Sequence, residues 1–130
     1  MEAIKILVVD DDQESRDLLS EVLGSNGYSV SVVESAKAAR AVLSHENGYC
    51  IVIADLQMPD GTGLDLLQEL RLRTPRHDVV LMSSFIGGAE RARALDLGVD
   101  ALLEKPFRLT ELLQVVEGLA SRQSSGVPAP

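Results

Sequence analysis

Acidic, hydroxyl and lysine side chains follow or end several short apolar runs of this sequence. Those that could share one site are Asp10, Asp11, Asp55, Ser83 and Lys105. Two carboxylates that lie about 4 Å apart repel each other by roughly 4 kcal/mol at an effective dielectric constant of about 20. A positive group should therefore lie between these acids. Magnesium prefers oxygen ligands and keeps several bound waters, so the residue types predict a magnesium site.

The same residue types have the parts needed to accept a phosphoryl group. An aspartate can attack phosphorus, while a metal ion and Lys105 would neutralise the phosphate oxygens. The hydroxyl of Ser83 could donate a hydrogen bond to one of these oxygens. Each residue alone also has a structural interpretation, because acids after a strand often cap the next helix, as we expect for Asp12. An aspartate before Leu-Gln-Met-Pro, as at Asp55, can simply begin a turn.

Alternating apolar runs and amphipathic stretches must position these residues. Strands are expected at Ile4–Val9, Tyr28–Val33, Cys50–Ala54, Val79–Ser83 and Ala101–Glu104. Helices are expected at Asp12–Leu23, Ala36–Ser44, Leu64–Arg73 (closed by Pro75), Ala89–Leu97 and Leu109–Ala120. This alternation predicts an α/β fold with one doubly wound parallel sheet and helices on both faces. Functional groups of such sheets gather beyond the carboxyl ends of the strands, where the candidate residues lie.

Composition limits the classes of protein to which the chain can belong. It has 130 residues, 45% apolar and 25% charged, with a net charge of −8, which suits one folded domain. No apolar run approaches the roughly 20 residues that span a bilayer, and no signal peptide is visible. A single cysteine cannot form an internal disulfide, which favours a cytoplasmic location. The acidic balance argues against direct binding of nucleic acid.

Residues 1–120 are expected to form the domain, and the Ser/Pro-rich residues 121–130 a flexible tail or the start of a linker.

Other polar residues have mainly structural interpretations. His45 and His77 are expected in exposed loops. Arg71, Arg73 and Arg76 cluster at the predicted end of a helix, where they would offset the negative end of the helix dipole.

Four motifs in this order resemble the receiver domain of two-component response regulators. They are Ile6-Leu7-Val8-Val9-Asp10-Asp11-Asp12, Asp55-Leu56-Gln57-Met58-Pro59-Asp60-Gly61, Leu81-Met82-Ser83-Ser84 and Glu104-Lys105-Pro106-Phe107. The resemblance extends from Ile4 to about Arg122. It implies a flavodoxin-like (βα)5 fold whose five strands have the order 2-1-3-4-5.

The resemblance also implies a role for each acid. By position, Asp55 resembles the phosphoacceptor and one of the metal ligands. Asp11 resembles the direct magnesium ligand, and Asp10 the acid that holds a metal-bound water. The backbone carbonyl of Gln57 would be the third protein ligand. The implied cofactor is Mg²⁺, with Mn²⁺ as a possible substitute.

Around the phosphoryl group, the resemblance implies three further roles and reveals two departures. Ser83 matches the hydroxyl that contacts the phosphoryl group, and Lys105 the lysine that pairs with it. Pro106 matches a proline whose preceding peptide bond is usually cis. Leu102 stands where the family usually has Tyr or Phe, so the ring switch of the family is absent here. Ser84 stands where Ala or Gly is common.

The implied function is a phosphorylation-controlled signalling switch. A phosphohistidine of a sensor kinase or phosphotransfer protein would supply the phosphoryl group to Asp55, and the change would shift the face formed by the fourth helix, fifth strand and fifth helix. Such a domain phosphorylates and dephosphorylates itself and does not turn over an external substrate. The expected partners are the kinase and an effector domain or protein, with no direct contact to nucleic acid or membrane.

Two alternatives stay open. A phosphohydrolase of the haloacid dehalogenase type would use Asp10 as its nucleophile, although Gln13-Glu14 fits that pattern poorly and the chain has no room for a cap domain. A receiver-like binding module would never be phosphorylated, and the sequence feature that favours this alternative is Leu102 in place of the usual aromatic residue. The identity of the phosphorylated aspartate distinguishes these possibilities.

Overall fold

Five parallel strands form the central sheet of the structure, a computed structural model that describes residues 3–58, 60–73 and 76–124. The strands are β1 (Lys5–Val9), β2 (Ser29–Val33), β3 (Tyr49–Asp55), β6 (Asp78–Ser83) and β7 (Ala101–Glu104). They lie in the order β2-β1-β3-β6-β7, and every neighbouring pair is parallel. Because β6 and β7 are the fourth and fifth strands of this sheet, the predicted order 2-1-3-4-5 is confirmed.

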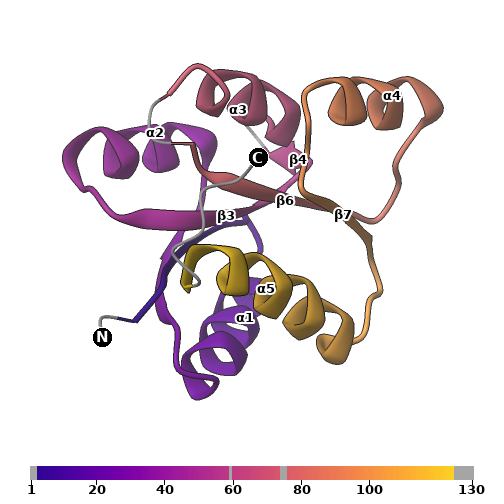
Figure 1. Cartoon of the computed structure of the whole chain (residues 1–130). Coiled ribbons are helices and arrows are strands. Elements are labelled where there is room, and N and C mark those ends of the chain that lie inside the picture. Colours follow the sequence, from indigo (N-terminus) through magenta and orange to yellow (C-terminus); the bar gives the residue numbers. More distant parts are fainter. Residues whose placement is uncertain (1–2, 59, 74–75, 125–130) are drawn as a thin grey trace.

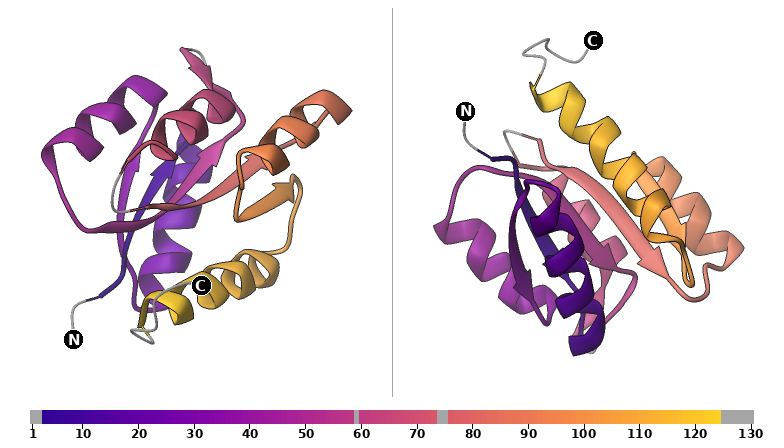
Figure 2. Two further views of the ribbon diagram at one scale, coloured as in Figure 1. Left: turned by 45° about the horizontal axis from the view of Figure 1, so that its top comes forward. Right: turned by 90° about the horizontal axis from the view of Figure 1, so that it is seen from below.

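Five helices cover the two faces of this sheet. They are α1 (Gln13–Ser25), α2 (Ala36–His45), α3 (Gly63–Leu70), α4 (Gly88–Asp96) and α5 (Leu109–Ser124). Helices α1 and α5 lie on one face, and α2, α3 and α4 lie on the other (Figures 1 and 2). Among the described residues, no helix has the length and apolar character needed to cross a membrane.

The central strands are buried on both faces, as their uniformly apolar runs predict. Along β1, Leu7 and Val9 pack with side chains of α2 and α3, whereas Ile6 and Val8 pack with side chains of α1 and α5. The sheet therefore separates two apolar cores. This double burial fixes the register of β1, since a slip by one residue would exchange its two faces.

The structure differs most from the sequence-based expectation in three places, and the other element boundaries shift by at most two residues. Helix α3 ends at Leu70, before the predicted Arg73, because the backbone amides of Leu72 and Arg73 bond carbonyls only three residues earlier. Pro75, expected to close this helix, lies outside the described residues. Helix α5 continues beyond the predicted end at Ala120, to Ser124. Residues 125–130 of the predicted tail lie outside the described part of the chain.

The third difference is a short antiparallel hairpin between β3 and α3. Its strands are β4 (Gln57–Met58) and β5 (Gly61–Thr62), and Gln57 pairs with Thr62. Strands of two residues are too short to produce an alternating pattern, so the sequence between the predicted strand Cys50–Ala54 and the predicted helix Leu64–Arg73 gives no signal for this hairpin. It begins two residues after Asp55 and so belongs to the edge where the candidate site lies.

Candidate functional site

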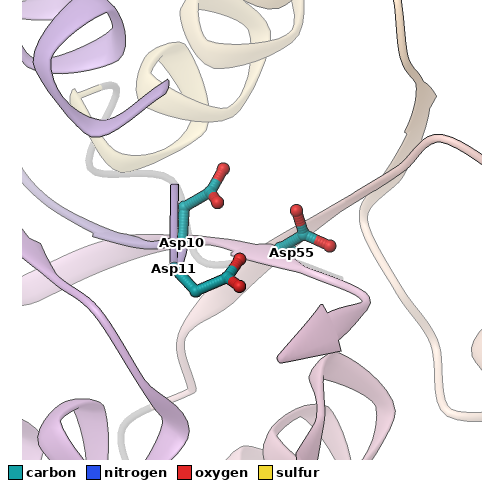
Figure 3. Close-up of side chains that lie close together, drawn as sticks. All are labelled: Asp10, Asp11 and Asp55. Carbon is teal, nitrogen blue, oxygen red and sulfur yellow. The ribbon is translucent and has the colours of Figure 1, made fainter. Parts of the chain in front are cut away.

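The carboxyl ends of β1 and β3 bring three acids together. Asp10 and Asp11 follow β1, Asp55 ends β3, and the three side chains lie beside one another in Figure 3. One carboxylate oxygen from each residue lies within 4.8 Å of those of the other two. Asp10 and Asp55 are buried, whereas Asp11 is exposed to solvent. The candidate acids thus form one cluster that is open on the side of Asp11.

Lys105 joins this cluster from the loop after β7. Its Nζ lies 2.7 Å from Oδ2 of Asp55 and 3.3 Å from Oδ2 of Asp10. The Lys105–Pro106 peptide bond is cis, as the resemblance implies. Burial lowers the pKa of Lys105, but the hydrogen bond and charge of Asp55, together with the charge of Asp10, outweigh burial and raise the pKa. The ammonium group therefore stays charged and shares its charge between two carboxylates.

The loop after β1 is fixed by side chains at its own ends. The Asp12 amide donates to Oδ1 of Asp10 at 3.0 Å, and the Ser15 amide donates to Oδ2 of Asp12 at 3.3 Å. The predicted role of Asp12 as the cap of α1 is confirmed. Arg16, which sequence reasoning missed, donates from Nη1 to the backbone carbonyl of Asp10 at 2.7 Å. The guanidinium thus holds the backbone from which the first acid projects.

The turn after β3 is narrow and tightly bonded. The Gln57 amide donates to Oδ1 of Asp55 at 2.9 Å, and the Gly63 amide donates to the Leu56 carbonyl at 2.9 Å. A Cβ on Gly63 would lie 2.7 Å from the Asp55 carbonyl oxygen and 2.9 Å from Cδ2 of Leu81. A residue larger than glycine at position 63 would therefore push on the backbone that carries Asp55.

Ser83 ends β6 and is buried at the same edge of the sheet. Its hydroxyl donates to the Phe85 carbonyl at 2.6 Å and accepts from the Phe85 amide at 3.1 Å. The Lys105 amide donates to the Ser83 carbonyl at 2.7 Å, so the strand end is tied to the lysine loop. The structure thus places Ser83 next to the site, with its hydroxyl bonded within its own loop.

Leu102 occupies the position at which the resemblance leads one to expect an aromatic ring. It lies in β7 opposite Leu81 and packs, partly buried, against the core on the α3 and α4 side. Ser84, the other departure, is exposed.

The donor set fits a small, hard cation such as Mg²⁺. Three carboxylates supply only oxygen ligands, and the single ammonium of Lys105 leaves negative charge uncompensated. The exposed side of Asp11 leaves room for the waters that magnesium retains. Asp10, Asp11 and Asp55 are the side chains that could hold the ion.

Comparison with known proteins gives the family. The sequence matches the response regulator receiver domain over residues 6–117. The transcriptional regulatory protein PmrA of Pectobacterium parmentieri is 36% identical over 119 residues, which are 92% of this chain and 53% of that protein. The response regulator protein FleR of Pseudomonas aeruginosa is 38% identical over 125 residues, 95% of this chain and 26% of that protein. The chain thus spans about half, or less, of the length of these curated relatives.

Solved structures agree with this assignment. A response regulator receiver protein from Pseudomonas putida superposes with a TM-score of 0.85 at 30% identity and covers 91% of this chain and 98% of its own. A CheY-like receiver domain protein from Methanospirillum hungatei superposes with a TM-score of 0.88 at 25% identity, covering 96% of this chain and 100% of its own. The chain belongs to the receiver domains of two-component response regulators.

Proposed function

We propose that Asp55 accepts a phosphoryl group from a phosphohistidine of a sensor kinase or phosphotransfer protein, with Mg²⁺ required. The observation that carries this proposal is the position of Lys105, whose Nζ bridges Asp55 and Asp10 beside the exposed Asp11. Asp10, Asp11 and Lys105 thereby surround the carboxylate of Asp55 at the end of β3. The two-component family to which the chain belongs supports a histidine kinase system as the source of the phosphoryl group.

Asp55 is better placed than Asp10 for the role of nucleophile. The side chain of Asp10 is fully buried, whereas that of Asp55 keeps 12% of its surface exposed. In the proposed transfer, a carboxylate oxygen of Asp55 forms a bond to phosphorus as the bond between phosphorus and the donor imidazole nitrogen breaks. When bound by Asp11, Asp55 and the Gln57 carbonyl, with Asp10 holding a bound water, Mg²⁺ would supply positive charge to the phosphate oxygens.

Lys105 and Ser83 would respond to the new phosphoryl group. Lys105 already donates to Asp55 and would pair with a phosphoryl oxygen. The hydroxyl of Ser83 would leave the Phe85 carbonyl and donate to another phosphoryl oxygen, so that the loop before α4 changes conformation. Because Leu102 has no ring to turn, this loop is the route by which we expect the change to reach the face formed by α4, β7 and α5.

The experiment that tests this proposal is incubation with acetyl phosphate and Mg²⁺, followed by intact mass measurement. The wild type should gain one phosphoryl group, and the Asp55→Asn variant should gain none. Reduction of the product with borohydride and peptide mapping should place the modification at residue 55. Modification at Asp10 would favour the phosphohydrolase alternative. A wild type that is never modified would favour the binding module, and modification without a divalent metal would contradict the magnesium requirement.

A further inference from the structure

We propose that Asp60 is a positioning residue for the metal site, because its carboxylate holds the β4–β5 hairpin against the N-terminus of α2. The inference rests on the proposed function, in which the backbone carbonyl of Gln57 is a ligand of Mg²⁺. Asp60 lies between β4 and β5, and Gln57 is the first residue of β4. The proposal thus connects a helix outside the site with a backbone ligand inside it.

Both oxygens of Asp60 bind backbone amides of α2. Oδ1 accepts from the Ala36 amide at 3.1 Å, and Oδ2 accepts from the Lys37 amide at 2.9 Å. The next amide, that of Ala38, donates to Oγ of Ser35 at 3.0 Å. The first three amides of α2 are therefore shared between a residue of the helix's own cap and a residue of the hairpin, 23 or more positions away in the chain.

The charge of Asp60 strengthens this contact. The hydrogen bond from the Lys37 amide lowers the pKa of Asp60. Desolvation raises it, but the Lys37 and Ala36 amides together keep the pKa below its ordinary value. The positive charge of Arg40 acts in the same direction. An ionised carboxylate at the N-terminus of a helix also interacts favourably with the helix dipole. Asp60 is therefore an anion at neutral pH, bound to the positive end of α2.

The hairpin needs such a support at its tip. At its base, Gln57 is bonded to Asp55, and Thr62 caps α3 by accepting from the Asp65 amide at 3.2 Å. Among the described residues, the two strands of the hairpin are joined by the pairs of Gln57 with Thr62 and of Met58 with Gly61, and Met58 packs, partly buried, against the core. An isolated two-stranded hairpin is marginally stable at best in water. The bonds of Asp60 to α2 therefore restrict the movement of the segment that carries the Gln57 carbonyl.

A purely structural role for Asp60 makes a different prediction from a positioning role. If Asp60 only caps α2, its removal should have the same kind of effect as the removal of Ser35, which caps the same helix. If Asp60 positions the hairpin, only its own removal should weaken the binding of metal. Ser35 is therefore the matched control.

The test is calorimetric titration of the folded proteins with Mg²⁺, well below their melting temperatures. Asp60→Ala should weaken Mg²⁺ binding about tenfold, the lower end of the usual effect for groups that support a metal ligand. Ser35→Ala should leave the affinity for Mg²⁺ unchanged, although it also lowers the stability of α2. Asp60→Asn keeps one oxygen acceptor, so its affinity should be intermediate.

A second measurement uses the reciprocity of coupled equilibria. If the hairpin transmits order from the metal to α2, Mg²⁺ should slow hydrogen exchange of the Ala36 and Lys37 amides in the wild type. In Asp60→Asn, Mg²⁺ should slow the exchange of these two amides less than in the wild type. This measurement and the Asn variant decide the question even if Asp60→Ala does not fold.

The outcomes separate this inference from the function on which it rests. Equal Mg²⁺ affinities of Asp60→Ala and the wild type would overturn it, as would equal losses in Asp60→Ala and Ser35→Ala. A wild type that does not bind Mg²⁺ would overturn it together with the proposed metal site. A wild type that binds Mg²⁺ but is never phosphorylated would contradict the proposed phosphoryl transfer alone.

Discussion

The two opposite edges of the sheet both gather buried acids, but they balance the charge of those acids differently. At the carboxyl edge, three acids cluster together, and Lys105 contacts two of them, Asp10 and Asp55. At the amino edge, Asp78 begins β6 and Asp100 precedes β7. The arginines that pair with these two acids are Arg71, Arg76 and Arg122. Among the described residues, the three acids of the carboxyl edge still outnumber the two cations Lys105 and Arg16, whereas the arginines that pair at the amino edge outnumber its two acids.

Arg71 shows how completely the amino edge is bonded. Its guanidinium donates to the backbone carbonyls of Leu97, Gly98 and His77 at 2.8–2.9 Å, and to Oδ2 of Asp100 at 3.0 Å. Burial lowers the pKa of Arg71, as does the charge of Arg76, and the charge of Asp100 opposes both. The Val79 amide also donates to Asp100, at 2.7 Å. These charges hold the end of α3, the start of β6 and the start of β7 together.

The comparison teaches that charge balance, and not the presence of buried acids, distinguishes a reactive edge from a structural one. Acids that are neutralised by an equal or greater positive charge stabilise the fold through their ion pairs. Acids that outnumber their cations can take up a metal ion and, with it, a phosphoryl group. Removal of an acidic side chain should therefore lower stability at the amino edge and raise it at the carboxyl edge.

The largest effect is expected from Asp100→Ala at the amino edge. This change leaves Arg71, whose side chain is only 15% exposed, without its carboxylate. Breaking such a largely buried pair costs about 3–5 kcal/mol of the free energy of unfolding. Urea denaturation measures this loss. Phosphorylation by acetyl phosphate should stay at the wild-type level at temperatures where the variant is folded.

Arg76→Gln is the control for this prediction. Arg76 is half exposed, so its loss should cost less than about 1 kcal/mol. A loss of similar size in both variants would contradict the view that burial makes the Arg71–Asp100 pair important. A change in phosphorylation in Asp100→Ala would contradict the separation of the two edges.

The next effect is expected from Gly63→Ala, which alters the geometry of the carboxyl edge without altering its charge. The added Cβ meets the Asp55 carbonyl, and such overpacking costs about 1–3 kcal/mol. The displaced backbone should also slow phosphorylation of Asp55, as measured by intact mass over time. Gly24→Ala is the control, because a Cβ at this position of α1 meets nothing within 4 Å. It should raise stability by up to about 1 kcal/mol. An unchanged rate in Gly63→Ala would show that charge alone governs the site.

Local patterns were enough to predict the main sheet and the position of the central residues of the site. Asp10, Asp55 and Lys105 each stand at or just beyond the end of an apolar run, and parallel strands bring such positions to one edge. The structure adds that Lys105 reaches both carboxylates. Their roles in phosphoryl transfer stay predictions from the resemblance.

Side-chain bonds between distant segments could not be predicted. The bond from the Lys37 amide to Asp60 and the pair of Arg71 with Asp100 join residues 23 and 29 positions apart. Such contacts leave no periodicity in the sequence. Arg71 was therefore expected only to offset a helix dipole. His77 was expected in an exposed loop, whereas it is half-buried and its Nδ1 lies 2.8 Å from the Tyr49 carbonyl oxygen.

A smaller effect, of opposite sign to that of Asp100→Ala, is expected from Asp11→Asn at the carboxyl edge. Removing one charge from a cluster with too few cations should raise stability without metal by about 1 kcal/mol, the value for an exposed pair in water. The same change removes a proposed ligand, so Mg²⁺ should raise the melting temperature of the variant less than that of the wild type. Thermal unfolding with and without Mg²⁺ measures both effects. A variant that is less stable than the wild type without metal would contradict the excess of negative charge.

The smallest effect concerns Asp60, whose charge is stabilised mainly by the backbone amides of α2, with a weaker contribution from the charge of Arg40. Its pKa in the folded protein is lowered below the ordinary value of 3.8. The ionised carboxylate therefore stabilises the fold above this ordinary value, and the contribution is lost as the pH falls through the lowered pKa. The difference in stability between the wild type and Asp60→Asn should be constant near neutral pH and should narrow below about pH 4. Urea denaturation of both proteins across this range measures the difference. A difference in stability that persists or widens below about pH 4 would show that the amides of α2 do not stabilise the charged form of Asp60. Backbone dipoles would then not replace cations at this edge.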